Sequence, residues 1–161
     1  MFNSRKRLTD EEFAAILIQD VQSAIDQDWE EFSRAYAQER PVAEKKGKKE
    51  LMASRLGSII FVLREKIRDR KKVVQIVDIL ETYSKKVEEE TGVSGLWDRA
   101  IDYFRTIDQD SVKGRDAKLW DTILEKPNDD FALKVAFESD MVQLVSRYVN
   151  VVQYCDEFGI K

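Results

Sequence analysis

The chain has 161 residues, of which 43% are hydrophobic and 36% charged, with a formal net charge of −4. This composition suits a single soluble domain and excludes both a disordered chain and a protein built from membrane spans. Because the sequence has no histidine and one cysteine, it excludes a Ser-His-Asp triad, a histidine-based zinc site, a CxxC pair and an internal disulfide.

We expect residues 1–8 to form a flexible basic arm and residues 9–161 to form one helical domain. The N-terminal sequence is basic but lacks the apolar core of a signal peptide. No apolar run approaches the ~20 residues that a membrane helix needs. We therefore expect a cytoplasmic protein without integral membrane association.

The first predicted helix opens with a capping box, in which the Thr9 hydroxyl and the Glu12 carboxylate satisfy each other's backbone amides. Apolar residues then recur every three or four positions, which predicts a helix over about 10–38. The segment 39–50 is expected to be a loop because it contains Pro41 and a glycine.

Two apolar stripes, over 52–67 and 73–87, are compatible with one helix over 48–91 or with two helices. Gly92 supplies the C-terminal stop in either case. A single helix would be about 66 Å long, whereas a compact domain of this size has a radius of gyration near ~15 Å. We therefore favour a break near Asp69–Lys72. An unbroken helix would instead indicate an elongated protein that dimerises through the overhang.

The remaining sequence predicts two short helices and one long one. The short helices are expected after a Ser94 cap and over 115–126. The last helix, over about 129–158, has a wide apolar face in which Arg147 is the only charged residue between 141 and 155. A face this wide is buried on more than one side, so we expect the central helix or half of a dimer interface. The predicted fold is an all-α bundle of five to six helices, three long and two short.

The charges are segregated along the chain. Residues 8–40 carry nine acids and two bases, whereas residues 41–72 carry eleven bases and four acids. Clustered bases on a helix and its neighbouring loop can neutralise the phosphates of a polyanion such as nucleic acid. The candidate polyanion-binding residues are Lys45, Lys46, Lys48, Lys49, Arg64, Arg68, Arg70, Lys71 and Lys72.

Internal pairing is the alternative that we favour for these bases. Antiparallel packing of the acidic helix against the basic segment would set opposite charges side by side and determine which helices pair, although each surface pair contributes only ~0–1 kcal/mol. An anionic membrane surface is a third possible partner. Phe61 is the only aromatic residue near the basic clusters, which disfavours binding of single strands.

Aromatic residues on the two short helices are candidate partner-binding residues. The tryptophans all lie on apolar stripes, where core packing is the usual role. Where a large aromatic ring is exposed, however, it can anchor a protein partner. The candidates are Trp97, Tyr103 and Trp120.

Two acid pairs have the helical spacing of Mg²⁺-dependent helical hydrolases: Asp78 with Glu81, and Asp98 with Asp102. Such spacing is expected by chance in a chain with 31 acidic residues. A hydrolase is therefore the third hypothesis, and no metal ligand, catalytic residue or cofactor is assigned.

Three consecutive acids, Glu88 to Glu90, fall at the C-terminal end of a predicted helix. The helix dipole disfavours acids there. The triplet therefore indicates either a tolerated surface or a docking patch for a basic partner.

These features together predict a non-enzymatic interaction module, such as an adaptor, an inhibitor or an assembly subunit. It would use amphipathic helix faces and charge patches to bind another protein or a second copy of itself, as a homodimer. The alternative is a nucleic-acid-binding helical subunit that uses residues 41–72.

Overall fold

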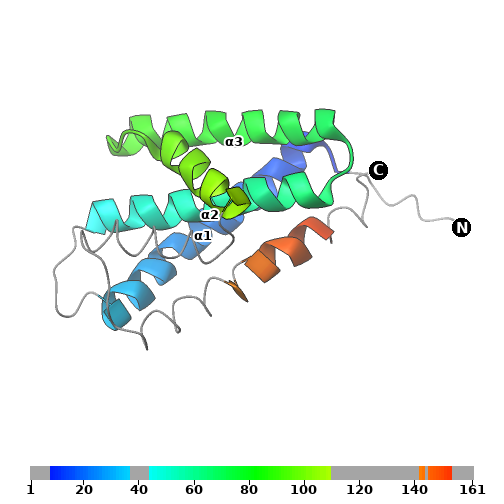
Figure 1. Cartoon of the computed structure of the whole chain (residues 1–161). Coiled ribbons are helices and arrows are strands. Elements are labelled where there is room, and N and C mark those ends of the chain that lie inside the picture. The colour runs from blue at the N-terminus through cyan, green and yellow to red at the C-terminus, as the bar shows by residue number, and fades with distance from the viewer. Residues whose placement is uncertain (1–7, 37–43, 110–141, 144, 154–161) are drawn as a thin grey trace, which may run out of the picture.

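The computed structural model describes residues 8–36, 44–109, 142–143 and 145–153 (Figure 1). Within these ranges the chain forms five helices and no strand, which confirms the predicted all-α class. Three helices are α1 (Asp10–Tyr36), α2 (Glu44–Lys66) and α3 (Arg70–Thr91). The other two run over 96–109 and 145–153. The basic arm, the predicted helix over 115–126 and most of the last predicted helix lie outside the described residues.

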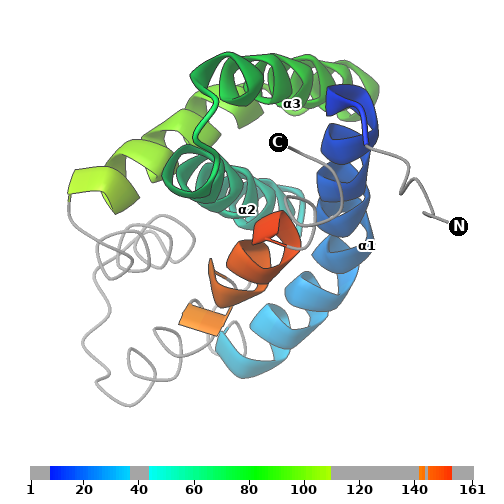
Figure 2. The same ribbon diagram turned by 90° about the vertical axis from the view of Figure 1, so that its right-hand side faces the viewer.

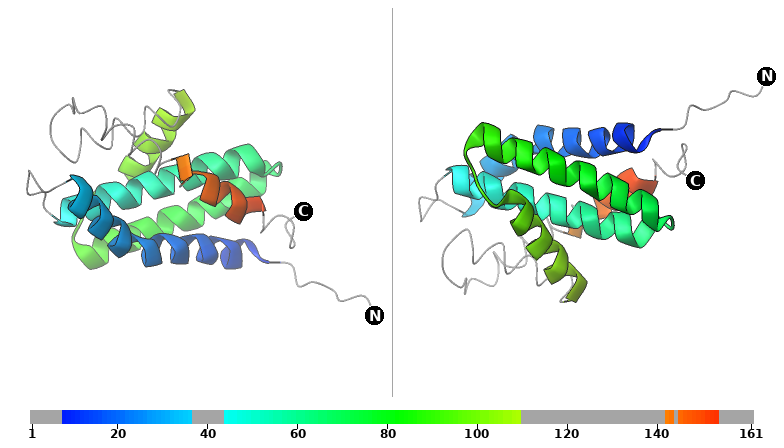
Figure 3. Two further views of the ribbon diagram at one scale, coloured as in Figure 1. Left: turned by 90° about the horizontal axis from the view of Figure 1, so that it is seen from below. Right: turned by 90° about the horizontal axis from the view of Figure 1, so that it is seen from above.

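Helix α2 occupies the middle of the described structure. In Figure 2 it is surrounded by α1, α3 and the helices over 96–109 and 145–153. Figure 3 shows α3 and the helix over 145–153 on opposite faces of the pair formed by α1 and α2. Each of α1, α2 and α3 contacts the other two.

Small side chains allow α2 to be buried on every side. Its buried residues include Ala53, Ser54, Gly57 and Ser58 as well as the larger apolar side chains Leu56, Ile59 and Leu63. A Cβ atom built on Gly57 would lie 2.7 Å from the carbonyl oxygen of Ala100. The helix over 96–109 therefore crosses α2 at a distance that only glycine permits.

The expectation that the last helix is central is wrong for its described part. Tyr148 and Val152 of the helix over 145–153 are buried, but Arg147 and Asn150 are exposed. Val142, which is also helical, is 55% exposed. This helix buries one face only, because the central position between the other helices is taken by α2.

The predicted loop over 39–50 is wrong from residue 44 onward, because α2 begins at Glu44. The sequence predicts that Gly47 weakens an early start of this helix, but in the structure this glycine leaves space for a neighbouring aromatic ring. A Cβ atom at this position would lie 2.0 Å from Cζ3 of Trp29. Trp29 in turn stacks on Phe32 with ring centroids 6.0 Å apart. Tertiary packing thus outweighs the low helix propensity of one glycine.

The predicted break between the second and third stripes is confirmed. α2 ends at Lys66 and α3 begins at Arg70. The side chain of Asp69 accepts hydrogen bonds from the backbone amides of Lys71 (3.0 Å) and Lys72 (3.4 Å), and so caps α3. The overhanging helix that would have indicated dimerisation does not form.

The predicted helix ends are confirmed for the start of α1 and the end of α3. The Thr9 amide donates to Glu12 (2.9 Å), and the Glu12 amide donates to the Thr9 hydroxyl (3.1 Å). Gly92 follows α3 with a φ of 63°, the left-handed conformation that ends helices. None of the helices in the described ranges combines the length and apolar character that crossing a membrane requires.

Candidate functional site

The structure divides the nine candidate polyanion-binding residues into two groups at opposite ends of α2. The first group lies in the first two turns of α2, and the second lies around its junction with α3. The first group consists of Lys45, Lys46, Lys48 and Lys49, and the second of Arg64, Arg68, Arg70, Lys71 and Lys72.

Internal contacts engage the first group. Lys48 Nζ lies 2.7 Å from Asp26 and 2.6 Å from Glu44. Hydrogen bonds to these two carboxylates raise the pKa of Lys48. Lys45 donates to the carbonyl oxygen of Gly92 at 3.4 Å. The lysines at this end of α2 therefore tie it to α1 and to the end of α3.

Arg64 in the second group also has a structural role. Its Nη2 lies 2.5 Å from Asp108, on the helix over 96–109. Its guanidinium lies over the rings of Phe61 and Phe104, at 5.6 and 5.1 Å from their centroids. The hydrogen bond from Arg64 lowers the pKa of the Asp108 carboxyl. These contacts fasten α2 to the following helix.

The predicted pairing between acidic α1 and the basic segment is confirmed at three positions. Lys48 pairs with Asp26, as described. Lys72 Nζ lies 3.3 Å from Asp10. Arg55 Nη2 donates to Asp28 at 2.7 Å. Acids of α1 therefore pair with bases of α2 and α3 where these helices pack together, as the internal-pairing hypothesis predicts.

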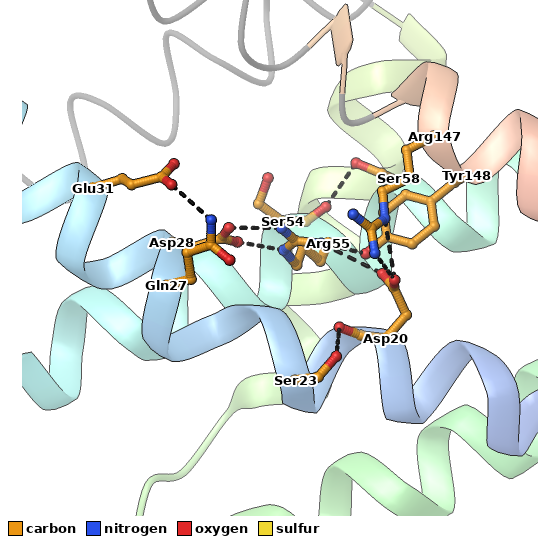
Figure 4. A network of polar contacts seen from close by, with 10 residues as sticks. All are labelled: Asp20, Ser23, Gln27, Asp28, Glu31, Ser54, Arg55, Ser58, Arg147 and Tyr148. Carbon is orange, nitrogen blue, oxygen red and sulfur yellow. Dashed lines mark hydrogen bonds and ion pairs between the residues drawn. The ribbon is translucent and has the colours of Figure 1, made fainter.

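Arg55 is the centre of a buried ionic network (Figure 4). It is 6% exposed and binds both carboxylate oxygens of Asp28 through Nε and Nη2. Its Nη1 donates to the Tyr148 hydroxyl at 2.9 Å and lies 3.5 Å from Asp20 Oδ2. Burial lowers the pKa of Arg55, but the hydrogen bonds and charges of Asp28 and Tyr148 together outweigh burial, so the pKa is raised.

The helix over 145–153 supplies two members of this network. Arg147 Nε donates to Asp20 Oδ1 at 3.1 Å, and Nη2 of the same side chain pairs with that oxygen. Burial raises the pKa of the Tyr148 hydroxyl, so it stays protonated near neutral pH. The network thus joins α1, α2 and the C-terminal helix.

Sequence analysis did not single out Arg55. The available signal was one arginine inside an apolar stretch of α2, between Ser54 and Leu56. A charged residue in such a stretch is buried only when it is paired. That pattern identifies a buried arginine but not its partners, which lie 27 and 93 residues away along the chain.

A second buried network places one candidate partner-binding residue in the core. Glu50 is 4% exposed and accepts from Arg99 Nη2 at 2.8 Å. Tyr103 donates to the same carboxylate at 2.7 Å and is 0% exposed. Burial and the nearby Glu50 charge raise the pKa of the Tyr103 hydroxyl. Tyr103 is therefore unable to serve as an exposed anchor, because its ring and hydroxyl are both satisfied internally.

The other two aromatic candidates have different positions. Trp97 is half-buried and packs against the core. Trp120 lies outside the described residues. Among the described residues, Trp97 therefore keeps part of its side chain accessible to a partner.

Two of the four candidate Mg²⁺-binding acids form ion pairs, and the other two are exposed to solvent. Glu81 pairs with Lys85 at 2.6 Å, and Asp102 pairs with Arg99 at 3.2 Å. Asp78 and Asp98 are exposed. In the part of the chain that the structure describes, no three acidic or cysteine side chains are grouped to hold a metal ion.

Glu88 provides the cap of the helix over 96–109, in place of the predicted Ser94. Its carboxylate accepts from the amides of Leu96 (2.7 Å) and Trp97 (3.2 Å). A carboxylate is favourable there because the first amides of a helix lack backbone partners. This contact gives Glu88 a structural role, so this member of the Glu88–Glu90 triplet does not require a docking partner to account for it.

We expect Glu88→Ala to lower the free energy of unfolding by about 1 kcal/mol, through loss of this cap. The neighbouring Glu89 is exposed, so Glu89→Ala is the matched control and should change stability much less. Urea unfolding followed by tryptophan fluorescence measures both. Equal effects of the two variants would show that the cap contributes nothing.

A shallow groove of about 400 Å³ lies between α1 and α3. Its mostly apolar lining comes from Ile18 of α1 and from Ile79 and Tyr83 of α3, with Thr82 beside them. Asp78 and Lys86 stand at its edge. The groove lacks the grouped acids of a metal site.

Comparisons with protein-family models, with curated proteins and with solved structures find no match to this chain.

Proposed function

We propose that the chain is a non-enzymatic protein–protein interaction module, acting as an adaptor, an inhibitor or an assembly subunit. The observation that carries this proposal is the apolar groove between α1 and α3. The most buried charged side chains, Arg55 and Glu50, are held in internal pairs. They support the fold and are not available to a substrate.

The shape and charge of the groove favour an amphipathic helix as its occupant. Ile79 and Tyr83 are four residues apart and present one apolar stripe of α3 toward Ile18. Asp78 and Lys86 are eight residues apart on α3, a rise of about 12 Å. A partner helix with an apolar stripe, a base near Asp78 and an acid near Lys86 would match this pattern.

We further propose that the protein works in the cytoplasm. We also propose that α2 and the helices around it form a single bundle. The contacts among α1, α2 and α3 support the bundle. A second copy of this chain remains one possible partner, and its binding would make the protein a homodimer.

Site-specific photo-crosslinking tests the groove. A photoreactive amino acid at Thr82, which is exposed at the groove, should capture a partner through a helical segment with the charge pattern above. The same probe at Asn150 is the matched control and should not capture it. Asn150 is exposed on the helix over 145–153, which lies on the other side of the α1–α2 pair from α3. Sedimentation of the purified chain shows whether the partner is a second copy.

Two variants make this test decisive. Ile79→Glu should abolish capture by placing a charge in the apolar lining. Lys86→Glu, at a side chain 71% exposed, should weaken capture without affecting folding. Equal capture from Thr82 and Asn150, or capture that survives both substitutions, would exclude the groove as the binding site.

A further inference from the structure

The junction between α2 and α3 carries four exposed bases within six residues. Lys66 ends α2, Arg68 lies between the helices, and Arg70 and Lys71 begin α3. We call these four residues the basic turn. It lies at one end of the described structure, beside the start of α1 (Figures 1 and 3).

Structural contacts already engage the acids around the basic turn. Asp69 caps α3 through its carboxylate. Glu65 pairs with Arg64 at 3.0 Å, and Asp10 pairs with Lys72. Among the described residues, no ion pair joins an acid to Lys66, Arg68 or Lys71. By contrast, Lys48 at the other end of α2 is paired with two carboxylates.

The first turn of α3 places its bases against the helix dipole. It contains Arg70, Lys71 and Lys72 and no acid, whereas α1 begins with three acids. A base at a helix N-terminus is unfavourable, because the helix dipole is positive there. The ion pair with Asp10 accounts for the presence of Lys72 in this turn. A hydrogen bond from Arg70 to the carbonyl oxygen of Arg64 (3.0 Å) accounts for a second base. Lys71 has no such structural explanation.

We propose that the basic turn binds the phosphate backbone of duplex nucleic acid through Lys66, Arg68 and Lys71. Phosphate contacts need only exposed cations that can approach the duplex, and a protruding turn provides them. A duplex is favoured over a single strand because the basic turn contains no aromatic residue that could stack on bases. The ring of Phe61, five residues before the turn, lies beneath the guanidinium of Arg64.

A membrane surface fits the basic turn less well. Stable attachment to a bilayer needs apolar side chains that insert beside the bases. Close to the turn, the described residues expose one large apolar side chain, Val74, at 57%. Binding to nucleic acid requires no such insertion and does not depend on the groove between α1 and α3.

Fluorescence anisotropy with a short labelled DNA duplex tests the proposal on the full chain. Binding at low salt should be weak and sequence-independent, and log K should fall with log salt with a slope of about −3, from three phosphate contacts. The triple variant Lys66→Glu, Arg68→Glu, Lys71→Glu should lose this binding. Because all three side chains are exposed, its circular dichroism should match that of the parent chain.

The matched control is the triple variant Lys85→Glu, Lys86→Glu, Arg105→Glu. It makes the same change in net charge at exposed side chains outside the basic turn and should retain binding. Equal loss in both variants would show a global charge effect and overturn the proposal. Absence of duplex binding by the parent chain would overturn it too, and binding only to phosphatidylserine vesicles would assign the turn to membranes instead.

Discussion

Replacing Arg55 with alanine is expected to lower the free energy of unfolding by about 3–5 kcal/mol. The side chain is 6% exposed and is shared by Asp28, Asp20 and Tyr148. Its removal leaves Asp28 without the cation that binds both of its oxygens, takes away one of the two arginines beside Asp20, and leaves the buried Tyr148 hydroxyl without its donor. Breaking a buried pair by removing one partner is far more costly than deleting a surface pair.

Equilibrium urea unfolding measures this effect, and Arg34→Ala provides the matched control. Arg34 pairs with Glu30 in the same helix, but the two side chains are about 70% exposed. That deletion should cost no more than ~0.5 kcal/mol. A loss below ~1 kcal/mol for Arg55→Ala would show that the buried network does not stabilise the fold.

Arg55→Ala should also have a local effect on the C-terminal helix. Tyr148 and Arg147 connect the helix over 145–153 to Asp20 and Arg55. Without Arg55, the amides of this helix should lose hydrogen-exchange protection more than those of α3, which makes no contact with the network. Uniform loss of protection would contradict the assignment of Arg55 as the residue that fastens this helix.

Gly57→Ala is expected to destabilise the protein by about 1–3 kcal/mol, although alanine is the better helix former. The new Cβ would lie 2.7 Å from the carbonyl oxygen of Ala100 and 2.9 Å from the amide nitrogen of Phe104. Both atoms belong to backbone, so the helix over 96–109 would have to move away from α2. That movement would strain the bonds between Glu50, Arg99 and Tyr103.

Gly47→Ala in the same helix is the comparison that isolates this cause. Both substitutions gain the same helix propensity, and both added Cβ atoms collide with a neighbour. At Gly47 the neighbour is the ring of Trp29, a half-buried side chain that can shift outward. Thermal unfolding should therefore show a smaller loss for Gly47→Ala than for Gly57→Ala, and the reverse order would contradict the packing argument.

Periodic apolar residues and capping signals were sufficient to predict the helical class and several helix ends. Thr9 and Glu12 predicted the start of α1, and Gly92 predicted the end of α3. Such signals are local, because a capping residue lies within a few positions of the amides it satisfies. The break before Arg70 was predicted differently, from the length that one continuous helix would have compared with the size of a compact domain.

Features that depend on distant contacts were not predictable in the same way. Gly47 appeared unfavourable for a helix because the sequence does not show that the ring of Trp29, on α1, fills the space beside it. The wide apolar face of the last predicted helix suggested a central position, yet α2 is central because its small residues admit neighbours on all sides. The cap at residue 96 comes from Glu88, and no sequence spacing rule connects the two.

The candidate site was only partly predictable for the same reason. Charge segregation correctly predicted the pairing of α1 with the basic segment. It did not separate the engaged lysines near Lys48 from the exposed basic turn, because that distinction depends on where Asp26 and Asp10 lie in the fold. The groove was not predicted, since Ile18 and Ile79 lie beside the periodic apolar stripes, and only the fold brings them together with Tyr83.

Hydrogen exchange of the amides of α2 tests most directly whether this helix is the central element on which both proposed surfaces depend. We predict that amides from Leu51 to Leu63 exchange most slowly of all and only through global unfolding, because every side of this segment is covered. Exchange of these amides as rapid as that of the helix over 145–153 would contradict the account.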